Sequence, residues 1–473
     1  MEQSLQLDMN FDGNKCNKFR SALENGEFTV LLECSLPDGE IDRDGAESRL
    51  KQFEKAVLDH TSLNTGLALT DFSANRSRWR AAEFATLLSP ENRDRHVVYV
   101  SGANTGREQV SELINIAANA GICNIVPVSG TLPGQLSVRD CRKTTFTEST
   151  MMLRMMQNTG LFTGAAVNPF QYMAYPLYAQ YFKAVKKLNL GAGFLVTQAG
   201  WDMLRIQSFA WFMMNRKLYY PKLTRLMILT PERVEDILAN KMAGIRISND
   251  FRRILERELH YSKNQFEAAQ YRRLELQAAG CRLMGFSGIQ ISGAENPARV
   301  QMILSRIEKA LKEYVSFPVW LEEYNAYMAS AEMAPFSNNF HLFDPILSRD
   351  YPLEDEVPSN ELGAPVCGKI ESLMLGLRRI LFKKADTQRP EHLKFAKKLL
   401  AGCRSCGKCR LPLREFVCPE HCPKRMADGP CGGVKPNGLC EHGNFECIHS
   451  KIVRFSHRRG TLHEVETKMV EQA

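Results

Sequence analysis

The sequence contains no apolar run of about 18 residues, the length that a membrane-spanning helix needs. The longest candidate, residues 160–182, is interrupted by Asn168, Pro169, Gln171 and Pro176. The N-terminus, MEQSLQLDMNFDGNK, lacks the basic and apolar regions of a secretory signal. We therefore expect no membrane span and no export, and we predict a cytoplasmic protein.

The chain also has little excess of charge. Lys and Arg number 61 and Asp and Glu number 53, which leaves +8 over 473 residues. A surplus this mild does not indicate a nucleic-acid partner. Hydrophobic residues make up 44 % and charged residues 24 %, which is ordinary globular composition and excludes fibrous or wholly disordered chains. The length predicts about two to four domains.

No G-x-G-x-x-G follows the first expected strand, which disfavours a dinucleotide-binding Rossmann domain. What the chain does contain is an alternation of short β-rich runs with longer helical patterns. In residues 107–121, for example, Val110, Leu113, Ile114 and Ala117 share one helical face. The expected strands are 28–34, 67–70, 96–101, 123–129, 163–167, 193–197, 224–229 and 284–289.

Such alternation implies parallel strands with crossover helices. About eight strands over roughly 290 residues fit a (β/α)8 TIM barrel, with a doubly wound sheet as the structural alternative. We predict an N-terminal arm at 1–26, the barrel at 27–320, a linker and basic helical region at 321–400, and a small cysteine-rich metal-binding domain at 401–473.

Two stretches lie between the barrel and the cysteine-rich domain. Residues 335–365 are rich in Pro, Asn, Ser and acids, which predicts a linker or an irregular wrap. Residues 369–400 carry nine Lys or Arg against three Asp or Glu. This basic segment is either a solvated helix that packs on the next domain or a docking face for an acidic electron carrier.

Cysteine is unevenly distributed. Eight of the fourteen cysteines lie close together near the C-terminus: Cys403, Cys406, Cys409, Cys418, Cys422, Cys431, Cys440 and Cys447. In a reducing compartment, clustered cysteines indicate metal ligands rather than disulfides. Eight thiolates match two [4Fe–4S] clusters, and the C-x2-C-x2-C start favours them, whereas two four-cysteine zinc sites are the alternative. His442 or His449 could replace one cysteine.

Polar residues follow or end several of the expected strands, at the end of a barrel where active sites lie. They are Glu33, Thr70, Ser101, Thr131, Asn168 and Gln198. Burial should raise the pKa of Glu33 and suit it to general acid catalysis, unless a basic neighbour pairs with it. The planar amide of Gln198 suits bidentate binding of a heterocycle, or is a satisfied structural amide.

These residues resemble the methylenetetrahydrofolate reductase family over about residues 27–315. The matching pieces of the barrel are TVLLEC, ANAGICNIVPVSGTLPG, GAAVNPF, KKLNLGAGFLVTQ and GIRISNDF. The C-terminal pieces GCRSCGKCRLP, CPEHCPKRMADGPCGG and GLCE resemble the cysteine-rich subunit or fused tail of anaerobe-type reductases of this family. The tail is the more specific half of the match.

The resemblance implies a flavin, either FAD or FMN, and hydride transfer between the flavin and the one-carbon unit of a reduced folate. Glu33 matches the general acid of the family, and Gln198 matches the glutamine that binds the pterin. Thr70 and Lys187 match residues that contact the flavin, and we assign Asn168 to the cofactor as well. The tail would receive electrons from a ferredoxin-like or other iron–sulfur carrier.

The sequence departs from the family at several positions. The family has an aspartate in the turn after the fourth strand, where this chain has Thr131, a neutral residue that we assign to substrate binding. Val98 stands where a flavin-contacting histidine is common, and Ser129 where a basic residue sometimes occurs. Asp140 is a candidate substitute for the missing carboxylate.

Three functions follow from these observations. The first is a flavin-dependent iron–sulfur enzyme that reduces methylene- to methyltetrahydrofolate. The second is the same site run in the opposite direction, so that it oxidises methyltetrahydrofolate in demethylation metabolism. The third is a barrel that binds folate or flavin without hydride transfer and serves as an electron-relay or assembly subunit. The sequence leaves the electron donor and any homo-oligomer open.

Overall fold

The computed structural model describes residues 17–36, 42–71, 79–131, 136–329, 368–383 and 394–472. The predicted linker at 335–365 lies outside the described residues. Among the helices in these ranges, none combines the length and the apolar character needed to cross a bilayer.

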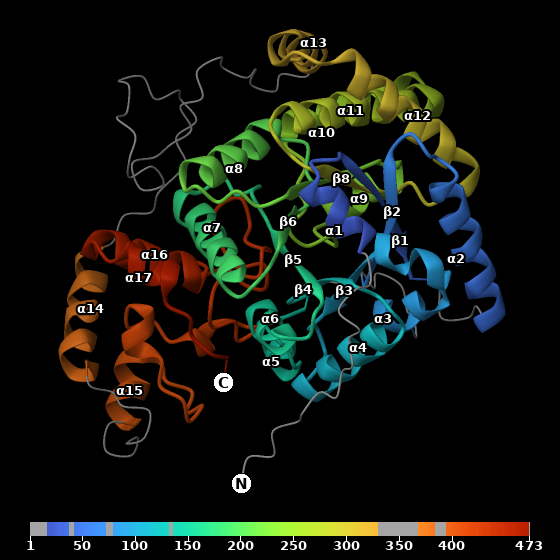
Figure 1. The fold of residues 1–473 in the computed structure, drawn as a ribbon. Helices are drawn as coiled ribbons and strands as arrows, with labels where there is room; N and C mark the ends of the chain where they lie inside the picture. Colours follow the sequence, from blue (N-terminus) through green and yellow to red (C-terminus); the bar gives the residue numbers. More distant parts are fainter. Residues whose placement is uncertain are drawn as a thin grey trace.

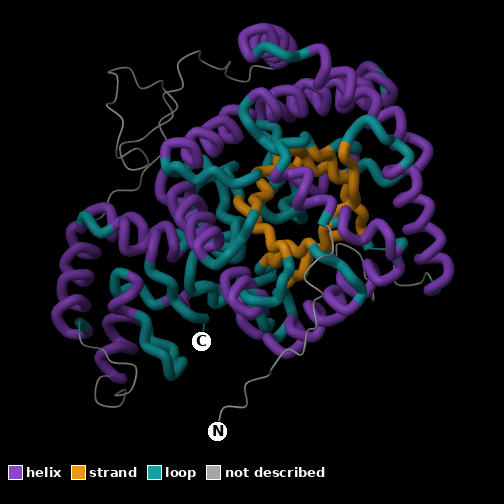
Figure 2. The backbone as a smooth tube through the Cα atoms, viewed as in Figure 1, coloured by secondary structure: helices purple, strands orange, loops and turns teal. Residues whose placement is uncertain are grey.

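Eight parallel strands close into a barrel in the order β1 to β8, with β8 paired back to β1 (Figure 2). The strands are β1 (Thr29–Ser35), β2 (Asn64–Thr70), β3 (Val97–Ser101), β4 (Asn124–Val128), β5 (Phe162–Val167), β6 (Phe194–Thr197), β7 (Lys222–Met227) and β8 (Gly288–Ser292). The closed sheet confirms the (β/α)8 prediction and excludes the doubly wound alternative.

Helices surround the barrel (Figure 1). In the N-terminal half these are α2 (Arg43–Leu58), α3 (Ala81–Phe84), α4 (Arg107–Asn119), α5 (Val138–Lys143), α6 (Ser149–Met156) and α7 (Ala174–Asn189), with 3-10 turns at Ala85–Leu87 and Pro90–Arg95. In the C-terminal half they are α8 (Met203–Asn215), α9 (Pro231–Leu238), α10 (Asn249–Tyr261), α11 (Lys263–Leu283), α12 (Pro297–Glu313) and α13 (Phe317–Ala329).

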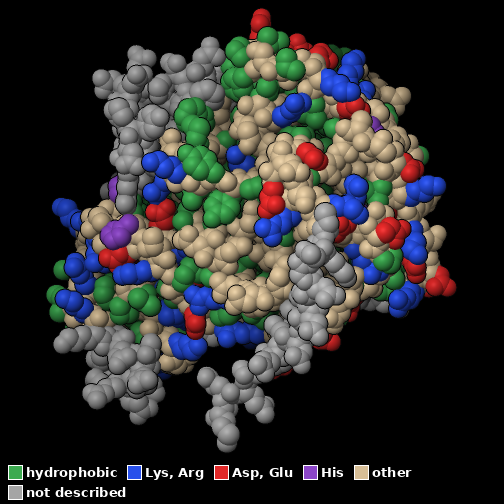
Figure 3. All heavy atoms as spheres, viewed as in Figure 1, with side chains coloured by type: hydrophobic (Ala, Val, Ile, Leu, Met, Phe, Trp, Pro, Cys, Tyr) green, Lys and Arg blue, Asp and Glu red, His purple; other side chains and the backbone are tan. Residues whose placement is uncertain are grey.

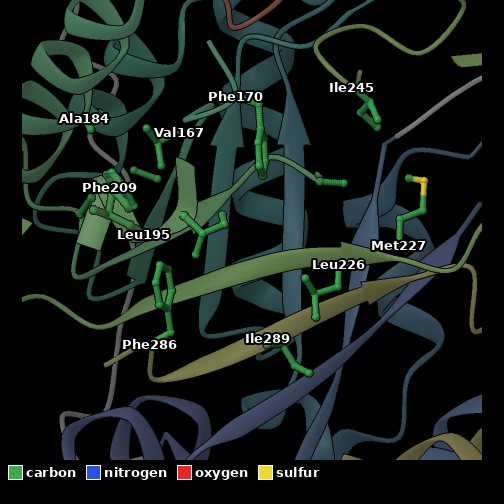
Figure 4. Packing of buried hydrophobic residues seen from close by; sticks show 14 of the residues in the cluster. Val167, Phe170, Ala184, Leu195, Phe209, Leu226, Met227, Ile245, Phe286 and Ile289 are labelled. Atoms are coloured by element: carbon green, nitrogen blue, oxygen red, sulfur yellow. The ribbon is translucent and has the colours of Figure 1, made fainter. Parts of the chain in front are cut away.

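Strand residues alternate between two cores. One set faces the helices, where Leu195, Leu226 and Ile289 pack with Phe170 and Phe209 (Figure 4). The other set faces the barrel axis and includes a small apolar cluster built from most of the strands. Because side chains alternate along a strand, a polar residue at an inward position lies inside the barrel.

Part of the predicted N-terminal arm belongs to the barrel. Residues 18–24 form helix α1 (Lys18–Glu24), which Asn17 caps by accepting a hydrogen bond from the Arg20 amide. Phe19 and Leu23 are buried in the inward-facing cluster with Phe194, so α1 closes the amino-terminal end of the barrel. Phe19 and Leu23, four residues apart, place α1 against the barrel, although the surrounding segment is polar.

The eighth strand begins later than predicted. We expected it at 284–289, but it runs over Gly288–Ser292. Helix α11 continues to Leu283 and ends in a turn in which Gly285 has φ +77° and the Phe286 amide bonds to the Cys281 carbonyl. The glycine therefore terminates a helix instead of starting a strand.

The cysteine-rich tail, residues 401–473, packs beside α7 (Figure 1). Its elements are the 3-10 turns Leu411–Arg414 and Pro419–His421 and the helices α16 (Ile448–Arg459) and α17 (Leu462–Thr467). Before it lie α14 (Lys369–Phe382) and α15 (Lys394–Ala401). Helices α16 and α17 both contact α7, so the tail is seated directly on the barrel wall.

Truncation of the Phe19 side chain, by which α1 packs into the end of the barrel, should destabilise the barrel. Replacing the fully buried Phe19 by Ala should lower the free energy of unfolding by about 3 to 5 kcal/mol, because the cavity cannot collapse between strands. Denaturant unfolding followed by circular dichroism measures this, with exposed Arg20→Ala as the control. A loss below about 1 kcal/mol would mean that α1 does not fill the barrel in solution.

Candidate functional site

A cavity of about 190 Å³ lies at the carboxyl ends of the strands. Its wall brings together seven residues singled out from the sequence: Thr70, Ser101, Ser129, Thr131, Asn168, Lys187 and Gln198. The tail supplies another part of the wall, Pro430, Cys431 and Gly432. The cavity is thus built jointly by the barrel and the cysteine-rich tail.

Glu33 lies inside the barrel and is not part of the cavity wall. It is only 4 % exposed, and its carboxylate accepts hydrogen bonds from Thr70, Gln290 and Ser292. Arg225 forms a bidentate ion pair with Glu33. Its Nε donates to Oε2 at 2.8 Å and its Nη2 donates to Oε1 at 2.5 Å. Both carboxylate oxygens are therefore fully engaged.

The prediction of a raised pKa for Glu33 was wrong. Burial acts to raise the pKa, but the Arg225 charge and the hydrogen bonds from Ser292, Arg225 and Gln290 outweigh it and hold the pKa below its ordinary value. Glu33 is therefore an ionised member of a buried ion pair and has no proton to donate at neutral pH. The alternative that a basic neighbour pairs with Glu33 is the arrangement observed.

Arg225 also holds Gln198. Its Nη1 donates to Gln198 Oε1 at 3.0 Å, the Ala199 amide donates to the same oxygen, and Gln198 Nε2 donates to the Ala243 carbonyl. The Gln198 amide is thus satisfied by the protein itself. Sequence reasoning missed Arg225, although a charged residue two positions after the inward-facing Leu223 was a usable signal.

Thr131 faces a lysine from the tail. Lys424 Nζ lies 3.2 Å from the Gly130 carbonyl oxygen and 3.4 Å from Thr131 Oγ1, and it pairs with Glu441 at 2.5 Å. Burial acts to lower the pKa of Lys424, but Glu441 and other nearby groups raise it, so the lysine stays charged. The turn that carries an aspartate in the family thus faces a cation here.

Asp140 does not replace the missing carboxylate. It lies on α5 with its side chain 53 % exposed, bonds to Ser137 and Lys143, and is absent from the cavity wall.

Asn168 links the tail to the barrel by hydrogen bonds at the cavity wall. Its Nδ2 donates to the Gly432 carbonyl at 2.7 Å and to the Gly244 carbonyl at 3.1 Å, while its Oδ1 accepts from the Phe170 amide. The residue that we assigned to a cofactor therefore bonds to the tail and to neighbouring barrel loops.

The main joint between tail and barrel is a buried network of charges. Glu148, 1 % exposed, accepts hydrogen bonds from the amides of Ala427 and Asp428 and pairs with Lys183 at 2.7 Å. Lys183 Nζ also donates to the carbonyls of Gly429 and Pro430. One carboxylate and one ammonium group of the barrel thus satisfy four consecutive residues of the tail.

A second ion pair extends this joint. Lys186 Nζ lies 3.4 Å from Asp428 Oδ1, and the same oxygen accepts from Arg414 and from the Val470 amide. Burial, assisted by Arg414, lowers the pKa of Lys186 to about 7 in spite of Asp428. We name the contacts of Glu148, Lys183 and Lys186 with Asp428–Pro430 the charge joint.

The charge joint bears on the flavin that the family resemblance implies. Lys187, which matches a flavin-contacting lysine, donates to the Ala166 carbonyl at 2.6 Å, and burial together with Lys183 lowers its pKa to about 7. Lys183, which also lines the cavity, is engaged by Glu148 and the tail. A cavity of about 190 Å³ is smaller than the roughly 300 Å³ of a small ligand site. With the tail docked, both lysines are engaged and the cavity has room for one ring system at most, so a whole flavin does not fit.

The eight cysteines of the tail are free thiols. Within the described residues, no three His, Cys, Asp or Glu side chains lie close enough together to hold a metal ion. Three of the thiols are nevertheless neighbours. Burial, together with Cys406 and Cys403, raises the pKa of Cys418 to about 11.

The later cysteines form a second neighbourhood. Burial and the nearby Cys447 and Cys440 raise the pKa of Cys422, and burial, Glu441 and the nearby Cys422 raise the pKa of Cys431. These contacts divide the tail into an earlier and a later group in chain order. A metal ligand must be a thiolate, so a metal that binds these buried thiols has to displace their protons.

The chain was compared with known proteins by sequence and by structure. Residues 382–473 match the family model of the methylene-tetrahydrofolate reductase C terminal, which confirms the predicted identity of the tail. No curated protein matches the chain by sequence.

The similar solved structures are distant. A Clostridium thermocellum protein described as binding two copies of 5-methyl-5,6,7,8-tetrahydrofolic acid is 13 % identical, over 62 % of this chain and 99 % of its own, with a TM-score of 0.44. An N-acetylneuraminate lyase from Mycoplasma synoviae is 12 % identical, over 64 % of this chain and 82 % of its own, with a TM-score of 0.35. At these scores neither similarity assigns a ligand or an activity to this chain.

Removal of Arg225 should restore a protonated Glu33. In Arg225→Met, burial is no longer offset by the guanidinium, so the pKa of Glu33 should rise above its ordinary value of 4.5. Infrared spectra should then show a protonated carboxyl band near neutral pH that is absent from the wild type and from Arg225→Lys. The band is assigned by its loss in Glu33→Gln/Arg225→Met, and its absence from Arg225→Met would contradict the described balance.

Removal of the Glu148 charge should loosen the tail. Glu148→Gln leaves Lys183 buried without its counter-ion, which should cost about 3 to 5 kcal/mol of unfolding free energy. Limited proteolysis should then cut the tail at least tenfold faster, since the local opening becomes more frequent. The matched control is Asp140→Asn on exposed α5, and equal cleavage rates in both variants would show that the charge joint does not hold the tail.

Proposed function

We propose that this protein is a folate-binding electron-relay subunit of the methylenetetrahydrofolate reductase type. The barrel cavity binds the pterin of a reduced folate, and the cysteine-rich tail carries the metal centres. The observation that carries this proposal is the docking of a reductase-type C-terminal domain over the barrel, where Cys431 and Thr131 line one cavity.

The cavity suits a small, partly apolar heterocycle. Val128, Val167 and Val196 supply apolar surface, while the Thr131 hydroxyl and the backbone around Gln198 supply polar groups. This mixture is typical of sites for small organic ligands. The cavity volume accommodates a ring system better than a folate and a second cofactor together.

The charge distribution disfavours hydride transfer by this chain. Formation of an iminium ion from a methylene bridge needs a proton donor, and Glu33 is held ionised by Arg225. A cation that develops on the substrate gains stability from a nearby anion, but Thr131 is neutral and the neighbouring Lys424 is already paired with Glu441. At an effective dielectric near 20 such charges are worth a few kcal/mol, roughly a hundredfold or more in rate.

The tail thiols supply the redox part of the proposal. We propose that Cys403, Cys406, Cys409 and Cys418 hold one [4Fe–4S] cluster and Cys422, Cys431, Cys440 and Cys447 hold another. The support is the spacing of the cysteines and the two neighbourhoods of thiols. Metal binding would also supply folding energy to a segment that is short and rich in loops.

Flavin-dependent interconversion of methylene- and methyltetrahydrofolate is the second candidate. It is favoured by Thr70, Lys187 and Gln198, since all three line the cavity at positions that match the family. A flavin there would supply hydride transfer. This candidate requires the tail to shift away from α7, and the direction of the reaction would depend on the electron partner.

Anaerobic purification with metal and flavin analysis, together with methyltetrahydrofolate binding by calorimetry, tests the proposal. We expect about eight irons per chain, no flavin, one bound folate and no dye reduction by methyltetrahydrofolate. Ala166→Phe, which fills the cavity, should weaken folate binding at least tenfold, whereas Met302→Phe on exposed α12 should not.

The three parts of the proposal, namely the absence of a flavin, the iron–sulfur tail and the folate site, can each be rejected by a separate result. Stoichiometric flavin with dye reduction would establish the enzyme instead, and the Glu33→Gln variant would then test proton transfer. Zinc in place of iron would make the tail a structural domain and overturn the relay. Absence of folate binding by the wild type would overturn the assignment of the cavity.

A further inference from the structure

Helix α14 leaves an apolar stripe in solvent. Ile370, Leu373 and Ile380 are 80 %, 74 % and 78 % exposed, and Leu377 and Leu381 complete the stripe. Their spacing of three, four, three and one places them on one helical face. Leu375 and Phe382 are buried on the other side of the helix. The packing of α14 therefore does not use the exposed stripe.

Helix α15 adds a second stripe. Phe395 and Leu399, four residues apart, are 79 % and 73 % exposed. The two helices pack against each other, and Arg378 Nε donates to the Leu400 carbonyl at 2.6 Å. Large apolar side chains gathered on one small unit mark an interaction surface rather than scattered exposure. We name the exposed apolar side chains of α14 and α15 the α14–α15 face.

The rim of the α14–α15 face is positively charged. In residues 368–383 and 394–409, the one carboxylate is Glu371, which is neutralised by Lys451 and Arg454. The exposed basic residues in these ranges are Lys369, Arg379, Lys383, Lys398, Arg404 and Lys408. Figure 3 shows hydrophobic and basic side chains side by side at the left edge of the molecule, where Figure 1 places α14.

The face adjoins the first cysteine group. Helix α15 ends at Ala401, and the Cys403 amide bonds to the Lys397 carbonyl of the same helix. Cys406 is half-buried in the loop that follows. A partner seated on α15 therefore lies next to the thiols that begin the tail.

We propose that the α14–α15 face is the docking site of an acidic electron-carrier protein with an apolar centre to its own interface. An apolar core within a charged rim is the usual anatomy of protein interfaces, and the cationic rim selects an anionic partner. A second copy of this chain is disfavoured because two such rims repel each other. The choice of an electron carrier rests on the proposed function, whereas the location and charge of the surface do not.

Binding of a purified acidic ferredoxin to the full-length, metal-loaded chain tests the inference. Affinity by calorimetry should fall about tenfold or more between roughly 50 and 500 mM salt, because screening weakens the charged rim. The double variant Ile370→Glu/Ile380→Glu should weaken binding at least tenfold. The matched control Tyr219→Glu/Val315→Glu also places two acids at exposed apolar sites, 80 % and 75 % exposed, and should bind as the wild type does.

Several outcomes would overturn the inference. One is a wild type that binds no ferredoxin at low salt, and another is an equal loss of affinity in both double variants. A wild-type dimer that becomes a monomer in Ile370→Glu/Ile380→Glu, measured by light scattering, would make the face a contact between copies. Ferredoxin binding that emerges only in Glu354→Gln/Asp355→Asn/Glu356→Gln would show that the acidic segment of the chain itself covers the face.

Methyltetrahydrofolate binding by the same variants separates this inference from the proposed function. All four exposed sites lie outside the cavity wall, so folate affinity should not change. Loss of folate binding in the wild type with ferredoxin docking intact would reject the proposed folate role and leave the docking site standing.

Discussion

The charge joint between the barrel and the tail is the interaction on which the site depends. Glu148 and Lys183 are almost fully buried, so each charge needs the other and the backbone groups of Asp428–Pro430. This requirement holds the loop in place, and the same loop continues into Cys431 and Gly432 of the cavity wall. The barrel and the cysteine-rich tail therefore build the wall of one cavity together.

The ion pair between Glu33 and Arg225, inside the barrel, determines the chemistry available to these two side chains. Arg225 engages Glu33 and Gln198, the two residues that most resemble the catalytic set of the reductase family. The tail matches the C-terminal domain of the reductase family, and the barrel places both residues beside Arg225. Glu33 is held there as a carboxylate and the Gln198 amide is already satisfied by the protein, so neither side chain is free for the role that the resemblance implies.

Local patterns were sufficient for much of the fold. Short β-rich runs between stretches of helical apolar spacing located all eight strands, seven of them within a few residues, because each pattern is a property of one short segment. The eighth strand was displaced because Gly285 ends a helix. Helix α1 was missed because only Phe19 and Leu23 reveal its packing. Six of the seven strand-end or cofactor assignments reached the cavity wall, while Glu33 lies outside it within the barrel.

The sequence by itself determined the barrel, the order of the segments and the cysteine-rich tail, since hydrophobic period and cysteine spacing are properties of short stretches. Only the tertiary structure decided which charges meet. Glu33 and Arg225 are 192 residues apart, and Glu148 and Asp428 are 280 apart. Whether a buried carboxylate is a proton donor or half of an ion pair depends on the balance between desolvation and such a partner. That balance exists only once the barrel has closed and the tail has docked.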